Sequence, residues 1–446
     1  MELKKYNANH TQVLKINQIV RTISETHKFD KDKLIAINTS DVENGVMGNG
    51  TLTFVDELKG QFKKTIVKDD ILFSEIRPAN RRFAKVTTKN TKDYVVSTKL
   101  MVLRKYNEDV DLEYFYYCLT NQPFLDILQR RAENRIGSFP QITFDLLSEY
   151  AFPIPPISEQ KRISSVISTL DKKIALNRQI NQNLEAMAKQ LYDYWFVQFD
   201  FPDENGRPYK SSGGKMVWNE KLKRDIPISW ETKLIDDVAE IYNGATPSTM
   251  NELNYGGDIV WVTPKDLSDQ KQKFVYKGER NISQVGYDSC STHLLPLNTI
   301  LMSSRAPIGL LAIAKTELCT NQGFKSFVPK SGNTTIYLYY YLQHHIRQIE
   351  QLGTGTTFKE VSREDILKFP MLKPSDNVLD LWEEMVSALN DRQLEIQKEN
   401  ESLTKQRDEL LPLLMNGQVS VNSDLSVYKK RRGKVPSSIQ NDVSDI

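Results

Sequence analysis

Basic side chains gather in one part of this sequence of 446 residues. Between Arg77 and Lys105 the chain has nine lysines and arginines and one acidic residue, Asp93. Lysine and arginine neutralise phosphate groups, so this window could form part of a nucleic-acid contact. The whole chain has a net charge of only +2, and such binding must therefore come from local patches. The alternative is an ordinary solvated face.

Residues that could carry out catalysis do not form a complete motif. Neither form of the adenine-methylation motif, Asn-Pro-Pro-Tyr or Asp-Pro-Pro-Tyr, occurs, and the nearest string, which starts at Ile154, lacks both the amide or acid and the aromatic residue. Gly353 and Gly355 begin a glycine pattern that Phe358 interrupts, and the glycines before Lys215 lack the following Ser or Thr of a phosphate loop. We therefore expect no catalytic site in this chain.

Metal-binding patterns are also missing. Asp203, Glu231 and Lys233 resemble a nuclease pattern, but they lie on either side of a linker-like stretch. His344 and His345 are adjacent, and on a helix adjacent side chains point about 100° apart. The cysteines lie far apart in the sequence, at Cys118, Cys290 and Cys319. Their spacing argues against a zinc site or a disulfide framework, and we expect no metal and no cofactor in this chain.

The composition is that of a globular protein, with 39% hydrophobic and 26% charged residues. The length predicts two or three domains. The longest apolar run, Ile308 to Ala314, is far shorter than the roughly 20 residues that cross a bilayer. The residues after Met1 do not form a secretory signal, so we expect a cytoplasmic protein.

The sequence repeats itself once. Ile71, Leu72, Ser74 and Pro78 match Ile300, Leu301, Ser303 and Pro307 at an offset of 229 residues. Phe115 to Tyr117 match Tyr339 to Tyr341 at an offset of 224, and the helical stretches that follow match at 219. Insertions and deletions in loops around a shared core would produce this drift. Each copy is expected to be a mixed α/β globular segment followed by one long helix.

Short apolar runs predict the strands of each copy, at Leu34 to Ile37, Tyr94 to Val96, Ile259 to Val262 and Gly309 to Ala314. The tyrosine-rich segments 112–119 and 336–342 could be helix or strand, and apolar residues at helical spacing favour helix. The fold class is therefore α+β.

Two long helices carry a stripe of mainly apolar residues at alternating steps of four and three. In the first helix these are Ile163, Ile167, Leu170, Ile174, Asn177, Asn181, Leu184, Ala188, Leu191 and Trp195. In the second they are Trp382, Val386, Leu389, Gln393, Ile396, Asn400, Leu403, Arg407, Leu410 and Leu414. This period of 3.5 residues is typical of helices that pack along their length.

We expect the two stripes to form the seam of an antiparallel coiled coil. A buried Asn at a seam position costs stability but selects one register, and Asn181 and Asn400 occupy equivalent positions. The alternative is that each stripe is only the core face of a helix lying on its own domain. The expected divisions are 1–157, first globular domain; 158–198, central helix; 199–225, linker; 226–374, second globular domain; 375–417, C-terminal helix; and 418–446, disordered tail.

Several segments together resemble the specificity subunit family of type I restriction-modification enzymes. They are Ile228 to Trp230, Asp237 and Val238, Gly244 with Thr246 and Pro247, Asn321 to Phe324, Phe152 to Pro156 with Glu159 and Gln160, and Leu410 to Gly417. The resemblance implies two target recognition domains that each read half of a split DNA sequence, with two long helices as a ruler. The first copy lacks a counterpart of Trp230 and of Gly244, so its N-terminal strand and turn are expected to differ.

The resemblance implies partners but no catalysis by this chain. The partners are double-stranded DNA, two methyltransferase subunits and the restriction subunits, and S-adenosylmethionine, ATP and Mg²⁺ are expected on the protein partners. The alternatives are a single-chain restriction or methylation enzyme and a protein-only coiled-coil scaffold. Candidate docking positions on the outer helix faces are Arg178, Glu185, Lys189, Arg392 and Lys398.

Three places in each copy are expected to contact DNA, because basic and amide or hydroxyl side chains there follow strands or lie in loops. In the first copy they are Asn38, Thr39 and Ser40; Arg77, Arg81, Arg82 and Lys85; and Arg135, Ser138 and Gln141, with Lys89 and Lys99 from the basic window. In the second copy they are Thr263 and Lys265; Ser304 and Arg305; and Thr354, Thr356, Thr357 and Lys359.

Overall fold

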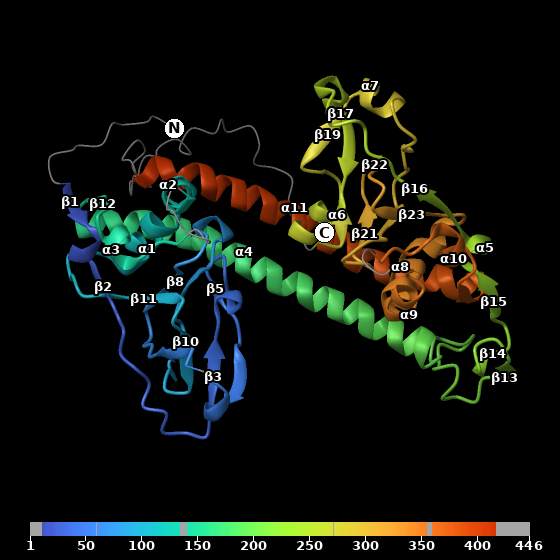
Figure 1. Ribbon diagram of the computed structural model, residues 1–446. Coiled ribbons are helices and arrows are strands. Elements are labelled where there is room, and N and C mark those ends of the chain that lie inside the picture. Colours follow the sequence, from blue (N-terminus) through green and yellow to red (C-terminus); the bar gives the residue numbers. More distant parts are fainter. Residues whose placement is uncertain (1–10, 59, 134–140, 271, 355–358, 416–446) are drawn as a thin grey trace, which may run out of the picture. The chain divides into compact units, whose positions relative to one another are not determined.

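The computed structural model describes residues 11–58, 60–133, 141–270, 272–354 and 359–415. The chain divides into two compact units: unit 1 consists of residues 1–175 and 401–446, and unit 2 consists of residues 176–400. Both long helices contribute to both units (Figure 1). Within the described ranges, no helix has the length and apolar character needed to cross a bilayer.

Unit 1 has two four-stranded sheets. One has the order β6 (Thr51–Phe54), β3 (Lys33–Ile37), β10 (Tyr94–Ser97) and β7 (Phe62–Lys64), and the other has β2 (Val20–Thr22), β11 (Leu100–Lys105), β8 (Ile71–Ser74) and β9 (Phe83–Lys85). Among the described residues of unit 1 there are also two strand pairs, β1 (Gln12–Lys15) with β12 (Ala151–Ile154) and β4 (Val42–Glu43) with β5 (Val46–Met47). The short helices are α1 (Leu112–Thr120), α2 (Gln122–Glu133) and α3 (Phe144–Ser148).

Unit 2 has one five-stranded and one three-stranded sheet. The first has the order β16 (Ala239–Asn243), β23 (Phe324–Pro329), β20 (Ile300–Ser303), β21 (Leu311–Ala314) and β18 (Phe274–Val275), and the second has β19 (Arg280–Ile282), β17 (Tyr255–Val262) and β22 (Cys319–Thr320). The strand pairs are β13 (Met216–Asn219) with β14 (Arg224–Pro227) and β15 (Glu231–Leu234) with β24 (Pro370–Lys373). The short helices are α5 (Ile235–Val238), α6 (Pro264–Gln270), α7 (Gln284–Asp288), α8 (Thr335–His344), α9 (Ile346–Gln351) and α10 (Arg363–Leu367).

These bounds confirm the predicted strands and resolve the tyrosine-rich segments as helices α1 and α8. Their tyrosines pack into the core; Tyr114 and Tyr340, for example, are each 1% exposed. A buried phenol needs a partner, and Tyr114 donates a hydrogen bond to the carbonyl of Pro153 over 2.9 Å. The helical spacing of apolar residues was therefore the decisive signal.

Strand register confirms the internal repeat residue by residue. In unit 1, Ile71 of β8 lies opposite Leu103 of β11. The predicted offset of 229 takes Ile71 to Ile300, and the offset of 224 takes Leu103 to Phe327; these two residues lie opposite each other in unit 2. The parallel pairs agree as well, with Ile37 opposite Val96 in unit 1. In unit 2 the equivalent pair is Val262 and Thr320. The two units therefore share one sheet framework.

The N-terminal strand of unit 1 corrects one expectation. Lys15 lies opposite Ala151, as Leu234 lies opposite Pro370, so β1 and β15 occupy the same place in their units. Strand β2 likewise matches β16, because Lys105 lies opposite Val20 as Pro329 lies opposite Ala239. At Gly244 of unit 2, an added Cβ would lie 2.2 Å from the carbonyl oxygen of Asn321, so only glycine allows this close backbone approach.

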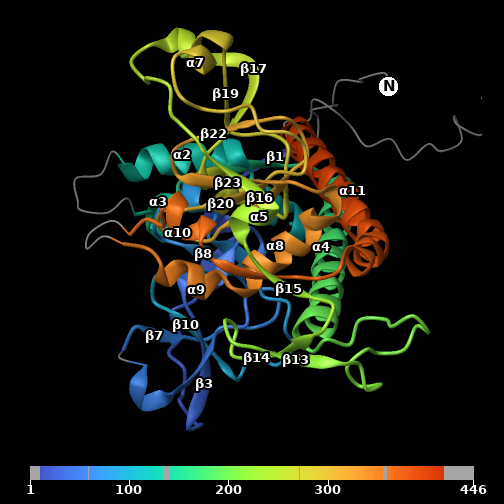
Figure 2. The ribbon, with the colours of Figure 1, turned by 90° about the vertical axis from the view of Figure 1, so that its right-hand side faces the viewer.

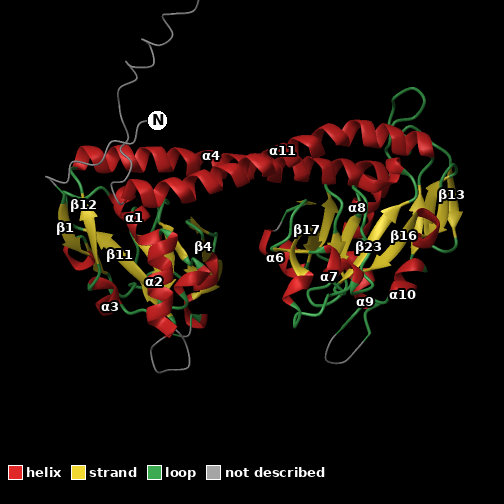
Figure 3. Ribbon diagram, turned by 90° about the horizontal axis from the view of Figure 1, so that it is seen from above, coloured by secondary structure: helices red, strands yellow, loops and turns green. Residues whose placement is uncertain are grey.

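The two long helices are α4 (Ile157–Tyr192), which continues as a π-helical segment over Asp193–Val197, and α11 (Asp376–Met415). They lie side by side and antiparallel within unit 2, where Asn177 bonds to Glu399 and Trp195 packs on Trp382 (Figure 3). Within unit 1, Asp171 pairs with Arg407. The antiparallel coiled coil is therefore present in both units.

The predicted seam positions are buried or half-buried along both helices. In unit 1, Ile163 and Ile167 of α4 share a core cluster with Leu414 of α11, but the same cluster contains α1 and the sheet. In unit 2, Trp195 and Trp382 likewise pack against both the facing helix and the tyrosines of α8. The seam therefore serves as coiled coil and domain core at once, and each of the two alternatives describes part of it.

The segment 199–225, expected to be a linker, packs as part of unit 2. Phe201 stacks on Trp230 with ring centroids 5.0 Å apart, and Phe199 meets the same indole edge-on at 5.3 Å. The hairpin of β13 and β14 follows (Figure 2). The segment is fixed by its two phenylalanines and by the carboxylate of Asp200, which accepts hydrogen bonds from Ser211. These few contacts do not show in the mainly polar composition, which is why a linker was predicted.

Candidate nucleic-acid interface

Three segments that were predicted to contact DNA meet at one place in each unit. In unit 1 the backbone N–H of Ile142 donates to the carbonyl of Glu75 over 2.7 Å, which joins the segment before α3 to the loop after β8. In unit 2 Val361 donates to Ser304 over 3.0 Å at the equivalent positions. This repeated contact fixes the loops at the same end of the shared framework.

A connection between strands links these loops to the turn after β3 or β17. Glu75 donates its N–H to the carbonyl of Lys99 over 3.0 Å, and Ser304 donates to Gly323 over 2.8 Å. The residues 97–99 and 321–323 therefore run between the other segments. We call these segments together the reader loops. In unit 1 they are the turn 38–41, the connection 97–99, the loop 75–82 and the pairing segment 141–142. In unit 2 they are the turn 263–266, the connection 321–323, the loop 304–309 and the pairing segment 360–361.

The turns have the same cap in both units. The backbone N–H of Asn38 donates to Asp41 Oδ2, and that of Thr263 donates to Asp266 Oδ2, each over 2.7 Å. Such local carboxylate bonds fix a turn without secondary structure. Asn38 is exposed, and its side-chain oxygen accepts a hydrogen bond from the backbone N–H of Thr39, so its NH2 group is the part that can meet a ligand; the hydroxyl of Thr263 donates to Asp266.

In unit 1 the structure brings Ser40, Arg77, Arg82, Lys99 and Gln141 together. Arg82 Nη1 donates to the carbonyl of Ser40 over 3.2 Å and thereby joins the turn to the loop. Gln141 forms a backbone bridge with Ile76, next to Arg77. Arg77 and Lys99 are exposed, and no ion pair within the described ranges occupies them.

Arg81, Lys85 and Lys89 are placed differently. Arg81 Nε donates a hydrogen bond to the side-chain oxygen of Asn44 over 2.7 Å, so this guanidinium stabilises the loop. Burial, and after it the nearby charge of Arg407, lowers the pKa of Arg81. Lys85 pairs with Glu113 of α1 at the start of β8, because β9 runs back along β8 and carries it away from the loop. Lys89 is exposed between β9 and β10 without a described contact to the reader loops.

In unit 2 the structure brings Thr263, Lys265, Ser304, Arg305 and Thr354 to the reader loops or beside them. Lys265 forms an exposed ion pair with Glu279 over 2.9 Å. Ser304 is 0% exposed and donates to the carbonyl of Gly323, so the prediction that it meets DNA directly is wrong, and it positions the loop instead. Lys359 is exposed.

Arg305 belongs to a group of three charged side chains. Its Nε donates to Glu360 Oε2 over 2.9 Å, and Lys325 Nζ lies 3.2 Å from Glu360 Oε1. Burial would raise the pKa of Glu360, but the hydrogen bonds from Arg305 and Lys325 outweigh it and leave the pKa below its ordinary value. Glu360 is therefore a carboxylate at neutral pH and holds the guanidinium in place.

Sequence reasoning missed several side chains at or beside the reader loops. Glu360, Lys325, Gln322 and Thr246 were not predicted, and the hydroxyl of Thr246 donates a short hydrogen bond to the side-chain oxygen of Gln322. Thr246 and Gln322 belong to segments that carry the family resemblance, but neither was predicted to contact DNA. The predicted contacts Arg135, Ser138, Thr356 and Thr357, and the tail 418–446, lie outside the described residues.

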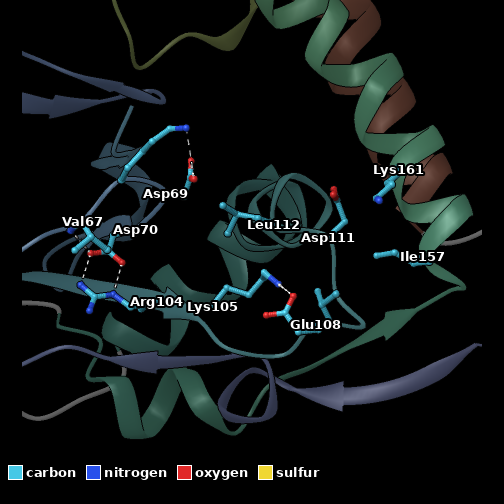
Figure 4. A pocket seen from close by; sticks show the side chains of 12 residues that line it. Val67, Asp69, Asp70, Arg104, Lys105, Glu108, Asp111, Leu112, Ile157 and Lys161 are labelled. Carbon is cyan, nitrogen blue, oxygen red and sulfur yellow. Dashed lines mark hydrogen bonds and ion pairs between the residues drawn. The ribbon is translucent and has the colours of Figure 1, made fainter. Parts of the chain in front are cut away.

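A cavity of about 550 Å³ in unit 1 is lined by apolar and charged side chains, and several of the charged ones pair with one another (Figure 4). Arg104 donates two hydrogen bonds of 2.8 Å to Asp70, and Lys105 lies 3.6 Å from Glu108. Asp70 precedes β8, so the cavity is at the opposite end of that strand from the reader loops. Among the described residues, no group of His, Cys, Asp and Glu is arranged to hold a metal ion.

Comparison with known protein families identifies two copies of one domain. The family described as the type I restriction modification DNA specificity domain matches residues 10–186 and again residues 227–399. The specificity subunit of the type I restriction enzyme HindI from Haemophilus influenzae is 31% identical over 91% of this chain and 98% of its own length. That of MjaIX from Methanocaldococcus jannaschii is 37% identical over 43% of this chain and 46% of its own length.

A solved structure supports the fold. The S subunit of a type I restriction-modification system from M. genitalium aligns with a TM-score of 0.53 at 15% sequence identity, and the alignment covers 95% of this chain and 100% of that one. The matched domain boundaries agree with the repeat that strand register reveals.

Proposed function

Since this chain belongs to the family of type I restriction modification DNA specificity domains, we infer that its reader loops are the surfaces that contact DNA. The chain is the DNA specificity subunit of a type I restriction-modification enzyme, and its two domains fit a bipartite target. The family supplies recognition rather than catalysis, as was predicted for this chain.

The observation that carries this assignment is the repeated meeting of the reader loops. The same backbone hydrogen bonds hold them in both units, whereas the side chains that they present differ. A shared framework with different exposed side chains is what two readers of different half-sites require, because base edges are distinguished by hydrogen-bond donors and acceptors. The exposed Arg77 and Lys99 of unit 1 and Arg305 of unit 2 supply positive charge for the phosphates or base edges.

We propose that the protein partners carry the chemistry. Two methyltransferase subunits would bind S-adenosylmethionine, and the restriction subunits would bind ATP and Mg²⁺, whereas this chain would bind none of these cofactors. Exposed side chains on the helices, among them Arg178, Lys189 and Arg392, are candidate docking positions. Glu185 is removed from that set because it faces inward and bonds to Lys273, Tyr340 and Gln393. Such an enzyme acts on cellular DNA, so we place it in the cytoplasm.

The test is to assemble the full chain with its methyltransferase subunits and to select bound duplexes from a randomised library. We expect a target with two fixed halves and an unread gap. Substitutions in the reader loops of one unit should change one half only. Methylation or cleavage of DNA by the isolated chain would instead support a single-chain enzyme, and a lack of any sequence preference would support a protein scaffold.

A further inference from the structure

Three equivalent positions in the two units differ together. Unit 2 has Arg305, Glu360 and Lys325. At the offsets of 229, 219 and 224 that strand register confirms, unit 1 has Ile76, Gln141 and Met101. A charged group in one unit is therefore replaced by an uncharged group in the other.

The backbone places both sets at the same point of the framework. Arg305 and Glu360 form an isolated antiparallel bridge, as do Ile76 and Gln141. In the adjoining sheet Lys325 lies opposite Met302. Met101 occupies the same register opposite Phe73. The difference between the units is therefore one of side chains and not of loop position.

The charges of the group leave the arginine with an uncompensated positive charge. The Lys325 side chain is only 7% exposed and needs a carboxylate partner, which Glu360 provides. Glu360 thus offsets the charge of Lys325, and it also orients the guanidinium of Arg305. The Arg305 side chain is 50% exposed, so it combines a fixed guanidinium plane with access from solvent.

The geometry favours a planar hydrogen-bonding ligand. The bond to Glu360 uses Nε of Arg305, and no described contact occupies its two terminal nitrogens. Paired terminal N–H groups match the O6 and N7 acceptors of guanine in the major groove. A phosphate would accept a mobile cation equally well, whereas a base edge gains from a guanidinium whose plane is fixed.

On the basis of the proposed function, we propose that Arg305, oriented by Glu360, reads a guanine in the half-site of unit 2. Glu360 and Lys325 are positioning residues in this arrangement. Unit 1 presents Ile76 at the matching position and has no donor there, so its half-site does not require guanine at that position.

The experiment uses the full chain assembled with its methyltransferase subunits, on a duplex whose two half-sites are known from methylation sequencing. Each guanine of the unit 2 half-site is replaced in turn by 7-deazaguanine, which lacks the N7 acceptor. We expect affinity to fall about tenfold to a hundredfold at one guanine. The Arg305→Ala complex, which has no side-chain donor at this position, should show no further loss at that guanine.

A second variant uses unit 1 as its template. Arg305→Ile with Glu360→Gln and Lys325→Met gives unit 2 a set of side chains that the same framework already accommodates in unit 1. We expect its selected target to accept other base pairs at that position and to keep the unit 1 half. Unchanged guanine discrimination by Arg305→Ala, or a unit 2 half-site without guanine, would overturn the inference alone. Absence of sequence preference in the unaltered complex would overturn the proposed function itself.

Discussion

Arg407 of α11 donates a hydrogen bond from Nη1 to Asp171 Oδ1 of α4 over 3.0 Å, across 236 residues of sequence. The other oxygen of Asp171 accepts a hydrogen bond of 2.8 Å from Tyr117 of α1. Helix α4, helix α11 and the globular part of unit 1 are therefore joined at one carboxylate. Unit 2 joins the same kinds of element differently, because Lys273 bonds there to Glu185 of α4, to Tyr340 of α8 and to Asn390 of α11.

The Asp171 junction predicts a local loss of stability. Arg407→Ala leaves the half-buried carboxylate of Asp171 with Tyr117 as its remaining hydrogen-bond donor in the junction. We expect the free energy of unfolding to fall by about 1–2 kcal/mol. Urea unfolding of the full chain measures this. Arg392→Ala is the matched control, since its pair with Glu395 on the same helix is exposed and should matter by about 0.5 kcal/mol or less. If both variants lower the free energy of unfolding equally, the Asp171 junction contributes no more stability than an exposed ion pair.

The Lys273 junction predicts a pH dependence. Burial lowers the pKa of Lys273 to about 8, although Glu185 acts in the opposite direction. Between about pH 8 and the ordinary lysine pKa of 10.5, the unfolded chain binds more protons at this residue than the folded chain does. Stability contributed by Lys273 must therefore rise with pH across that window.

Lys273→Met removes this proton linkage, so it isolates the effect. We expect the unfolding free energy of the unaltered chain, relative to that of Lys273→Met, to increase from pH 7.5 to pH 9.5 by about 1 kcal/mol or more, because one pKa unit corresponds to about 1.4 kcal/mol. Urea titrations at both pH values measure it. A relative stability that stays constant or decreases over that range contradicts the buried placement of the ammonium group.

Lys99 predicts a change in salt dependence. Its side chain is exposed on the connection within the reader loops of unit 1, so it should neutralise about one phosphate. Lys99→Ala should reduce the slope of log affinity against log salt by about 0.9. Binding of the assembled complex at several salt concentrations tests this. Lys68→Ala serves as control, because Lys68 is also an exposed lysine but lies beside Asp69 at the other end of β8. If both variants change the slope equally, the reader loops are not the contact surface.

The long helices predict how the unread gap depends on length. Removing residues 176–179 from α4 and 398–401 from α11 deletes both partners of the Asn177–Glu399 bond and shortens each helix by about 6 Å. We expect the gap to shorten by about one to two base pairs, at about 3.4 Å each, with both half-sites unchanged. Methylation sequencing reads both properties. Alanine substitutions at the same positions keep the helix length and should leave the gap unchanged. Altered half-sites with an unchanged gap would contradict the prediction that helix length sets the gap.

The sequence by itself determined the repeat, the long helices and the family. Periodicity and matched residues survive loop changes, because a shared core tolerates insertions only outside its strands and helices. The seam from Ile163 to Trp195 was predicted for this reason. Two segments of the reader loops, the turn and the loop, were also predicted from sequence, since polar residues that directly follow a buried strand must lie at its end.

The tertiary structure alone decided which of these side chains face outward. Lys85 and Arg77 lie in the same basic window, yet an antiparallel strand carries Lys85 to the far end of β8. Ser304 and Arg305 are neighbours, but successive side chains of an extended chain point to opposite sides, and only Arg305 is exposed. Glu360 reaches Arg305 from 55 residues away. Linear order fixes neither strand return, nor side-chain direction, nor contacts between distant segments, because these arise only when the sheets and helices pack.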